Sequence, residues 1–135
     1  MKITANFDGA ITYNPGGLAS YGFIVFKDKE ILARKNSTIG SGKDFSCNVA
    51  EYVGFIKLME FFIENKFEDF DIDVFSDSQL LVKQMNGELG AKKGSYKKYY
   101  FIAKEMLKKF YNLKIEWVRR EDNYLADEIS RPSRP

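Results

Sequence analysis

The chain has 135 residues, of which 44% are hydrophobic and 30% are charged, and it carries a formal net charge of +2. This composition predicts a single packed domain over residues 1–135 and argues against a disordered chain. The sequence has no histidine and one cysteine, Cys47, which excludes imidazole catalysis, tetrahedral zinc sites and an internal disulfide.

The first part of the chain is expected to form strands. Apolar and polar residues alternate over residues 2–8, which predicts a strand, and Asn-Pro-Gly-Gly at 14–17 indicates a turn. Two further strands are expected at 21–26 and 30–35, joined by a hairpin turn at 27–29.

Helices and strands alternate in the remainder of the chain. The expected elements are a loop at 40–46, a helix at 48–65, a strand at 72–76, helices at 78–86 and 96–111, a strand at 113–118, a short helix at 123–130 and a frayed tail at 131–135. An antiparallel three-strand meander followed by strand–helix–strand crossovers predicts an α/β protein with a mixed sheet and helices on both faces.

Glu51 is the most informative single residue. It shares its helical stripe with Phe55 and Leu58, so its side chain is expected to face the core. An ionised carboxylate there is costly unless it is paired or binds a metal. The alternative is a first-turn glutamate that interacts with the helix dipole, which does not explain the inward direction.

Three aspartates are candidates for the same site. Asp77 follows the strand at 72–76, where sites of α/β sheets form, although it could also cap the next helix. Asp8 ends the first strand, and the alternative is a turn aspartate before Gly9. Asp127 lies in the last expected helix, and its alternative is an exposed helical acid.

A set of four carboxylates without histidine selects hard cations, Mg²⁺ or Mn²⁺. Two such ions about 3.5–4 Å apart are the standard arrangement for phosphodiester displacement. The sequence therefore favours metal-dependent phosphodiester chemistry over the other reaction classes that carboxylates can serve.

Charge is distributed unevenly along the chain. Residues 60–77 contain seven acids and one base, whereas residues 83–114 contain nine lysines and two acids. The basic segment indicates a polyanionic partner, and the alternative is a solvated lysine-rich helix. The longest apolar stretch is interrupted by charges, and residues 1–8 lack a signal-peptide core, so we expect no membrane span and a cytoplasmic location.

Five short motifs occur in order along the chain. They are Phe7-Asp8-Gly9, Asn14-Pro15-Gly16-Gly17 with Tyr21-Gly22, Asn48-x-x-Glu51, Asp77-Ser78-Gln79-Leu80 and Val118-x-Arg120-x-x-Asn123-x-x-x-Asp127. With these motifs the chain resembles a type 1 ribonuclease H, of the small archaeal and bacterial variants without the basic protrusion helix. The resemblance implies a ribonuclease H-like five-stranded mixed sheet. It also implies hydrolysis of the RNA strand of RNA/DNA hybrids, leaving 5′-phosphate and 3′-hydroxyl ends.

The resemblance also assigns roles to residues. The implied ligands of two Mg²⁺ or Mn²⁺ ions, bound with substrate, are Asp8, Glu51, Asp77 and Asp127. The implied or expected substrate contacts are Gly9, Asn14, Asn48, Gln79, Lys92, Lys93, Lys97 and Lys98. Many family members carry a histidine before the last aspartate. Here we expect Arg120, with Arg119 second, to serve as that catalytic group, and a phosphate-contacting or solvated arginine is the alternative.

Two other functions remain open at this point. One is a hybrid- or RNA-binding module without nuclease activity, and the other is the same chemistry on double-stranded RNA. We expect a monomer without an organic cofactor. Trp117 is expected in the core, and Cys47 is expected to be structural.

Overall fold

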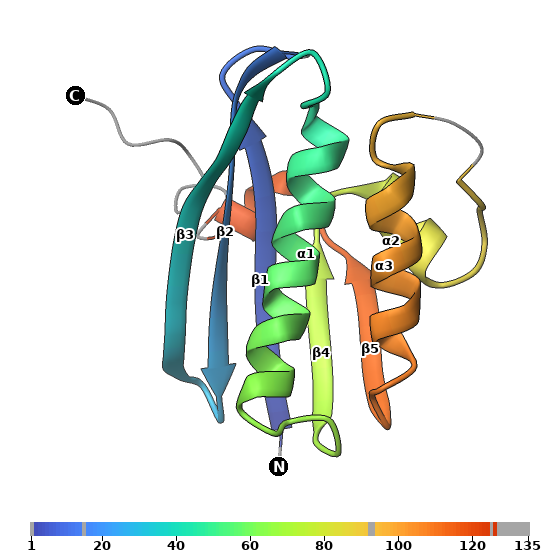
Figure 1. Ribbon diagram of the computed structural model, residues 1–135. Helices are drawn as coiled ribbons and strands as arrows, with labels where there is room; N and C mark the ends of the chain where they lie inside the picture. Colours follow the sequence, from blue (N-terminus) through green and yellow to red (C-terminus); the bar gives the residue numbers. More distant parts are fainter. Residues whose placement is uncertain (1, 15, 92–93, 125, 127–135) are drawn as a thin grey trace.

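A computed structural model describes residues 2–14, 16–91, 94–124 and 126 (Figure 1). The elements are β1 (Lys2–Ile11), β2 (Gly16–Lys27), β3 (Glu30–Gly42), α1 (Cys47–Glu64), β4 (Asp71–Ser76), α2 (Gln79–Met85), α3 (Lys97–Leu107), β5 (Asn112–Trp117) and the 3₁₀ helix η1 (Arg120–Asn123). The expected helix at 123–130 falls largely outside the described residues.

The strands form one five-stranded mixed sheet in the order β3-β2-β1-β4-β5. β1 pairs antiparallel with β2, which pairs antiparallel with β3, whereas the β1–β4 and β4–β5 pairs are parallel. This architecture confirms the expected fold. In the central parallel pair Asn6 lies opposite Phe75. The same register, continued two residues further, brings Asp8 beside Asp77; β1 continues to Ile11, so Asp8 lies within the strand and not at its end as expected.

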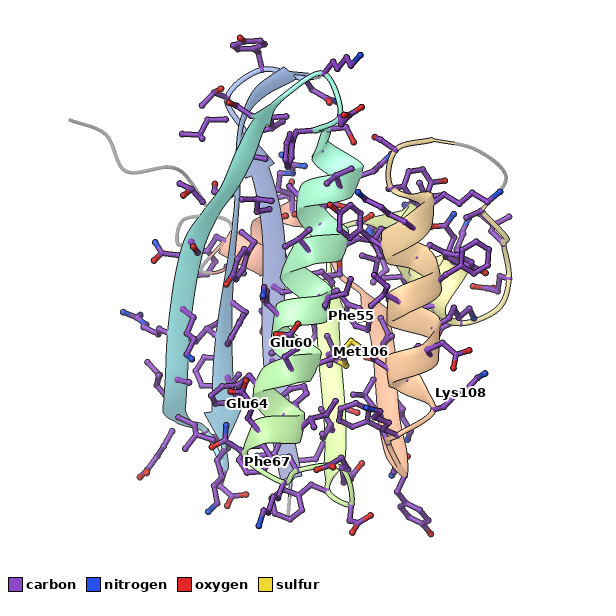
Figure 2. The ribbon with its side chains drawn as sticks, viewed as in Figure 1. Phe55, Glu60, Glu64, Phe67, Met106 and Lys108 are labelled. Atoms are coloured by element: carbon purple, nitrogen blue, oxygen red, sulfur yellow. The ribbon has the colours of Figure 1, made fainter. Side chains whose placement is uncertain are left out.

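Helices α1 and α3 cover one face of the sheet (Figure 1). The side chains of Ile3, Ala5 and Phe7 point from β1 into this core, where Phe55 is fully buried on α1. Figure 2 shows Phe55 and Met106 between α1 and α3, and Glu60 and Glu64 on the outer side of α1. This inside-outside pattern is the one that the helical periodicity predicts.

On the opposite face, η1 is held against β1 by one side chain. Asn123 Nδ2 donates to the carbonyl of Phe7 at 3.0 Å, and Asn6 Nδ2 donates to Asn123 Oδ1 at 2.9 Å. Because Asn123 is buried, these bonds fix where η1 lies relative to the end of β1. None of the helices in the described part of the chain is long and apolar enough to cross a lipid bilayer.

Candidate active site

Three acidic side chains converge at the carboxyl end of the central strands. Asp8 lies in the buried part of β1, Glu51 lies one turn into α1, and Asp77 directly follows β4. One carboxylate oxygen from each lies within 4.8 Å of the others. Asp8 is 2% exposed, Glu51 is 6% exposed and the Asp77 side chain is 2% exposed. Such a buried negative cluster is unfavourable unless a cation compensates it.

Local features of α1 and β1 place Glu51 beside Asp8. Ser46 caps α1, its hydroxyl accepting from the Val49 amide at 3.2 Å, so the helix begins directly before the site. Gly9 lets the helix approach the strand closely, because a Cβ at this position would collide with the main chain of Ala50 and Glu51. The Gly9 amide donates to Asp8 Oδ1 at 2.9 Å.

Burial raises the pKa of Glu51 to about 7, and the charge of Asp77 adds to the shift. Hydrogen bonds from Ser78 and Cys47 act in the opposite direction, the Cys47 Sγ lying 3.5 Å from Glu51 Oε1. Burial and the Glu51 charge raise the pKa of the Cys47 thiol to about 12, so the thiol keeps its proton and acts as the donor. Cys47 therefore contacts an acid of the site directly.

Arg120 lies at the rim of the acidic cluster. Its Nε is 3.6 Å from Asp77 Oδ2, and its side chain is 71% exposed toward solvent. The Arg120 charge also lowers the pKa of Glu51. Arg119 instead pairs with Asp122 at 3.2 Å on the surface. The geometry favours Arg120 over Arg119 for a role in the site, and that role stays a prediction.

Trp117 was expected in the core, and this expectation is wrong. The residue is 45% exposed, and its Nε1 donates to the carbonyl oxygen of Asp77 at 3.2 Å. The parallel register explains the contact, because Trp117 lies opposite Ser76, the residue before Asp77. The strand pairing, rather than the hydrophobicity of the ring, is the signal that could have predicted the contact between Trp117 and Asp77.

The expected substrate contacts divide into three groups. Asn14 Oδ1 accepts from the Cys47 amide at 3.2 Å, and Asn48 directly follows Cys47 in α1. Gln79 is exposed at the start of α2, two residues after Asp77, whereas Gly9 is buried. Lys97 and Lys98 are exposed at the start of α3. Asp127, Lys92 and Lys93 lie outside the described residues, and their roles stay predictions.

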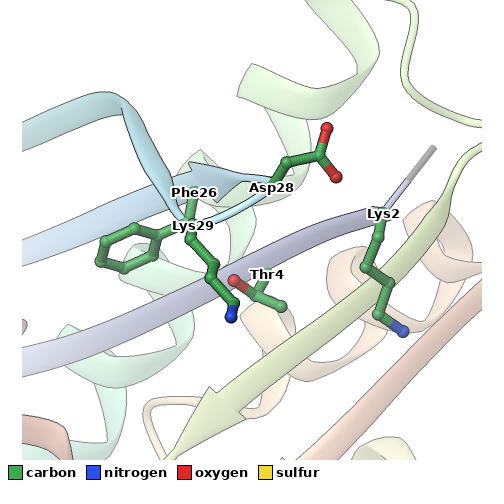
Figure 3. Close-up of a pocket in the computed structure, with 5 residues that line it drawn as sticks. All are labelled: Lys2, Thr4, Phe26, Asp28 and Lys29. Atoms are coloured by element: carbon green, nitrogen blue, oxygen red, sulfur yellow. The ribbon is translucent and has the colours of Figure 1, made fainter.

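A pocket of about 540 Å³ lies near the other end of β1 (Figure 3). It is lined by Lys2, Thr4, Phe26, Asp28 and Lys29. Lys2 is held there by Asp73 at 2.7 Å and Asp71 at 3.3 Å. The pocket shares no residue with the acidic cluster, so it is not part of the candidate site.

Comparison with known families matches residues 6–133 to the reverse transcriptase-like family. Among proteins of known sequence, the chain is 33% identical over 132 residues to the bifunctional protein Rv2228c of Mycobacterium tuberculosis and 33% identical over 129 residues to ribonuclease HI of Halobacterium salinarum. These matches cover 96% of the chain in both cases. The chain spans only 35% of the length of the first relative and 62% of the second.

Solved structures match over nearly their whole length. RNase H1 from Halobacterium salinarum is 32% identical with a TM-score of 0.85, and the match covers 96% of this chain and 95% of that one. The N-terminal RNase H domain of Rv2228c from Mycobacterium tuberculosis is 32% identical, with a TM-score of 0.84 and 96% of both chains covered. LC11-RNase H1, solved in complex with an RNA/DNA hybrid, is 29% identical with a TM-score of 0.84, and 95% of this chain and 93% of that one are covered. The chain therefore belongs to the reverse transcriptase-like family, as a ribonuclease H-like domain with the fold of the small type 1 enzymes.

Proposed function

We propose that this chain is a divalent-metal-dependent ribonuclease H that hydrolyses the RNA strand of RNA/DNA hybrids. The observation that carries the proposal is the buried cluster of Asp8, Glu51 and Asp77, whose carboxylate oxygens lie within 4.8 Å of one another. Family membership supports it, and the related LC11-RNase H1 was solved with such a hybrid. We propose that residues 1–135 act as one domain.

The donor set fits Mg²⁺ or Mn²⁺, because these hard cations prefer carboxylate oxygens and the described cluster contains only those. Asp8, Glu51 and Asp77 would hold the metal, and we propose Asp127 as the fourth ligand. Bound with substrate, two ions would supply an activated water and neutralise charge at the leaving oxygen, which gives 5′-phosphate and 3′-hydroxyl ends.

The protein's own residues bind and orient the substrate in this proposal. Asn14, Asn48 and Gln79 present amide groups that can contact the 2′-hydroxyl of RNA, which distinguishes it from DNA. Arg120 reaches the cluster from an exposed position, so its guanidinium can contact a phosphate beside Asp77. Lys97 and Lys98 bind the phosphate backbone away from the scissile bond.

The test compares four labelled substrates of one sequence: RNA/DNA hybrid, double-stranded RNA, single-stranded RNA and double-stranded DNA. Each is incubated with Mg²⁺, Mn²⁺ or EDTA, and the Asp77→Asn variant is the matched control. We expect cleavage of the RNA strand of the hybrid with either metal and none in EDTA or with the variant. Equal cleavage of double-stranded RNA would contradict the proposed specificity for RNA/DNA hybrids. Hybrid binding without cleavage by the wild-type protein would identify a binding module instead.

A further inference from the structure

Gln84 on α2 is a fully buried polar residue that lies outside the acidic cluster, with 0% of its surface exposed. Its amide makes three hydrogen bonds. Tyr52 Oη donates to Gln84 Oε1 at 2.6 Å, and Gln84 Nε2 donates to the Gly90 carbonyl at 3.1 Å and to Tyr96 Oη at 3.2 Å. The side chain thus connects α1, the segment after α2 and the residue before α3.

Only an amide side chain satisfies all three partners. The Gly90 carbonyl can only accept, so it requires the NH₂ group, and the Tyr52 hydroxyl then donates to the amide oxygen. The two tyrosines also stack, with ring centroids 5.7 Å apart and an interplanar angle of 10°. A buried network in which every member is satisfied fixes the relative position of the segments that it joins.

The network joins the two functional parts of the molecule. Tyr52 directly follows Glu51 of the acidic cluster, and Tyr96 directly precedes Lys97 and Lys98. These lysines are exposed at the start of α3, where they can bind a phosphate backbone. Gln84 is hydrogen-bonded to both tyrosines, so it links the helix that carries Glu51 to the start of α3.

We propose that Gln84 is a positioning residue for hybrid binding. It holds the start of α3 against α1, so that a nucleic-acid backbone bound by Lys97 and Lys98 passes over Asp8, Glu51 and Asp77. This inference rests on the proposed function. The inference goes beyond the proposed function because it assigns the geometry of hybrid binding to a buried residue that touches neither substrate nor metal. Small misplacements of the groups that bind substrate weaken productive binding strongly.

The experiment compares Gln84→Met, which keeps the side-chain length and removes all three hydrogen bonds, with the wild-type protein. Ile3→Val, in the core at the far end of β1, is the control for a general loss of stability. Melting temperature, hybrid affinity at several salt concentrations in Ca²⁺, and steady-state cleavage in Mg²⁺ are measured for each.

We expect Gln84→Met to raise the half-saturating hybrid concentration by about tenfold, with saturated turnover within about twofold of wild type. The slope of log affinity against log salt should flatten by about 1.4–1.8, the change expected when two phosphates are no longer neutralised. Ile3→Val should leave affinity and slope unchanged. A Gln84→Met protein with a lower melting temperature but wild-type affinity and salt slope would overturn the proposal, because Gln84 would then only stabilise the fold.

Two milder variants keep the proposal testable if Gln84→Met does not fold. Tyr52→Phe and Tyr96→Phe each remove one hydroxyl and keep the stacked rings, and both should weaken hybrid binding in the same direction by a smaller factor. Wild-type affinity in both would overturn the proposal. The Ca²⁺ binding assay does not depend on cleavage, so a wild-type protein that binds hybrid without cutting it contradicts the proposed activity and leaves the Gln84 result readable.

Discussion

Asp77 and Glu51 are buried acids of one cluster, yet their surroundings differ. Arg120 faces Asp77, whereas Glu51 accepts from Cys47 and lies where burial dominates its pKa. The sequence could predict this grouping because strand ends and an inward-facing helical acid are visible as patterns. It could not predict the contacts of Trp117 or Cys47. The contact of Trp117 depends on strand register, and that of Cys47 depends on the packing of the β1–β2 turn.

Replacing Asp77 with asparagine should abolish cleavage while the fold is retained. The amide keeps the size of the side chain but removes the charge that, in the proposed function, would hold divalent cations, so we expect turnover to fall by about a hundredfold or more. Cleavage of labelled hybrid in Mg²⁺ measures the fall, and circular dichroism checks the fold. Near-wild-type turnover in the variant would reduce Asp77 to a helix-capping residue.

Glu51→Gln should also remove activity, but it should stabilise the metal-free protein above neutral pH. The pKa of Glu51 rises from 4.5 to about 7 on folding, so the folded state binds more protons than the unfolded state between these values. Stability therefore falls as pH rises through this window, and the penalty above pH 7 is on the order of 3 kcal/mol.

Thermal melts in EDTA at pH 5 and pH 8 measure this effect. Between pH 5 and pH 8, the change in melting temperature of the wild-type protein should contain a destabilising contribution from Glu51. The glutamine variant should lack this contribution. A variant that melts below the wild-type protein at pH 8 would contradict the electrostatic explanation and assign Glu51 a structural role.

Arg120→Ala should slow turnover more than it weakens binding. Arg120 reaches Asp77, whereas Arg119 pairs with Asp122 on the surface, so Arg119→Ala is the matched control. Pre-steady-state cleavage in Mg²⁺ gives the chemical rate, and hybrid binding in Ca²⁺ gives the affinity. An effect on affinity alone would make Arg120 a phosphate-binding residue.

At the scale of elements, the helix expected at 48–65 agrees with α1 to within one residue, because its apolar residues recur at helical spacing. The strands β1–β3 are longer than expected and include residues 40–42, which glycines had marked as a loop. Pairing with a neighbouring strand overrides weak local propensity. Helix α3 is shorter than expected, and Ile102 within it is 47% exposed.

Gly9→Ala should move α1 away from β1. The added methyl group would collide with the main chain at Ala50 and Glu51, so α1 must shift away from β1 and carry Glu51 out of the cluster. We expect activity to fall at least about a hundredfold, with a reduced melting temperature. Ile3→Val, which loosens the core at the other end of β1, is the control and should lower the melting temperature slightly but leave activity unchanged.

At the scale of the whole molecule, the sequence shows that acids and lysines are separated along the chain. It does not show where the lysines lie relative to the acidic cluster. Lys97 and Lys98 follow Tyr96, which the Gln84 network ties to the helix that carries Glu51. The position of the start of α3 therefore depends on a buried glutamine that no motif singles out.

Replacing Lys92, Lys93, Lys97 and Lys98 with glutamine should weaken hybrid binding and leave the chemical step intact. Every phosphate that a lysine no longer neutralises should flatten the slope of log affinity against log salt by about 0.7–0.9. Glutamine at Lys108, the C-cap of α3 (Figure 2), and at the next residue, Lys109, is the control with matched chemistry. An unchanged slope in the quadruple variant would mean that these lysines are only solvated and that the backbone is held elsewhere.

The parallel pairing of β1 with β4 also constrains when the acidic cluster can form during synthesis of the chain. Asp8 and Asp77 come together only after residues 2–6 have paired with residues 71–75, a pairing of long sequence separation that forms late compared with local hairpins. A ribosome adds about 5–20 residues per second, so Asp77 is added seconds after the last residue of β3. The nascent chain next to its own messenger RNA is therefore without a complete acidic cluster until the crossover is made.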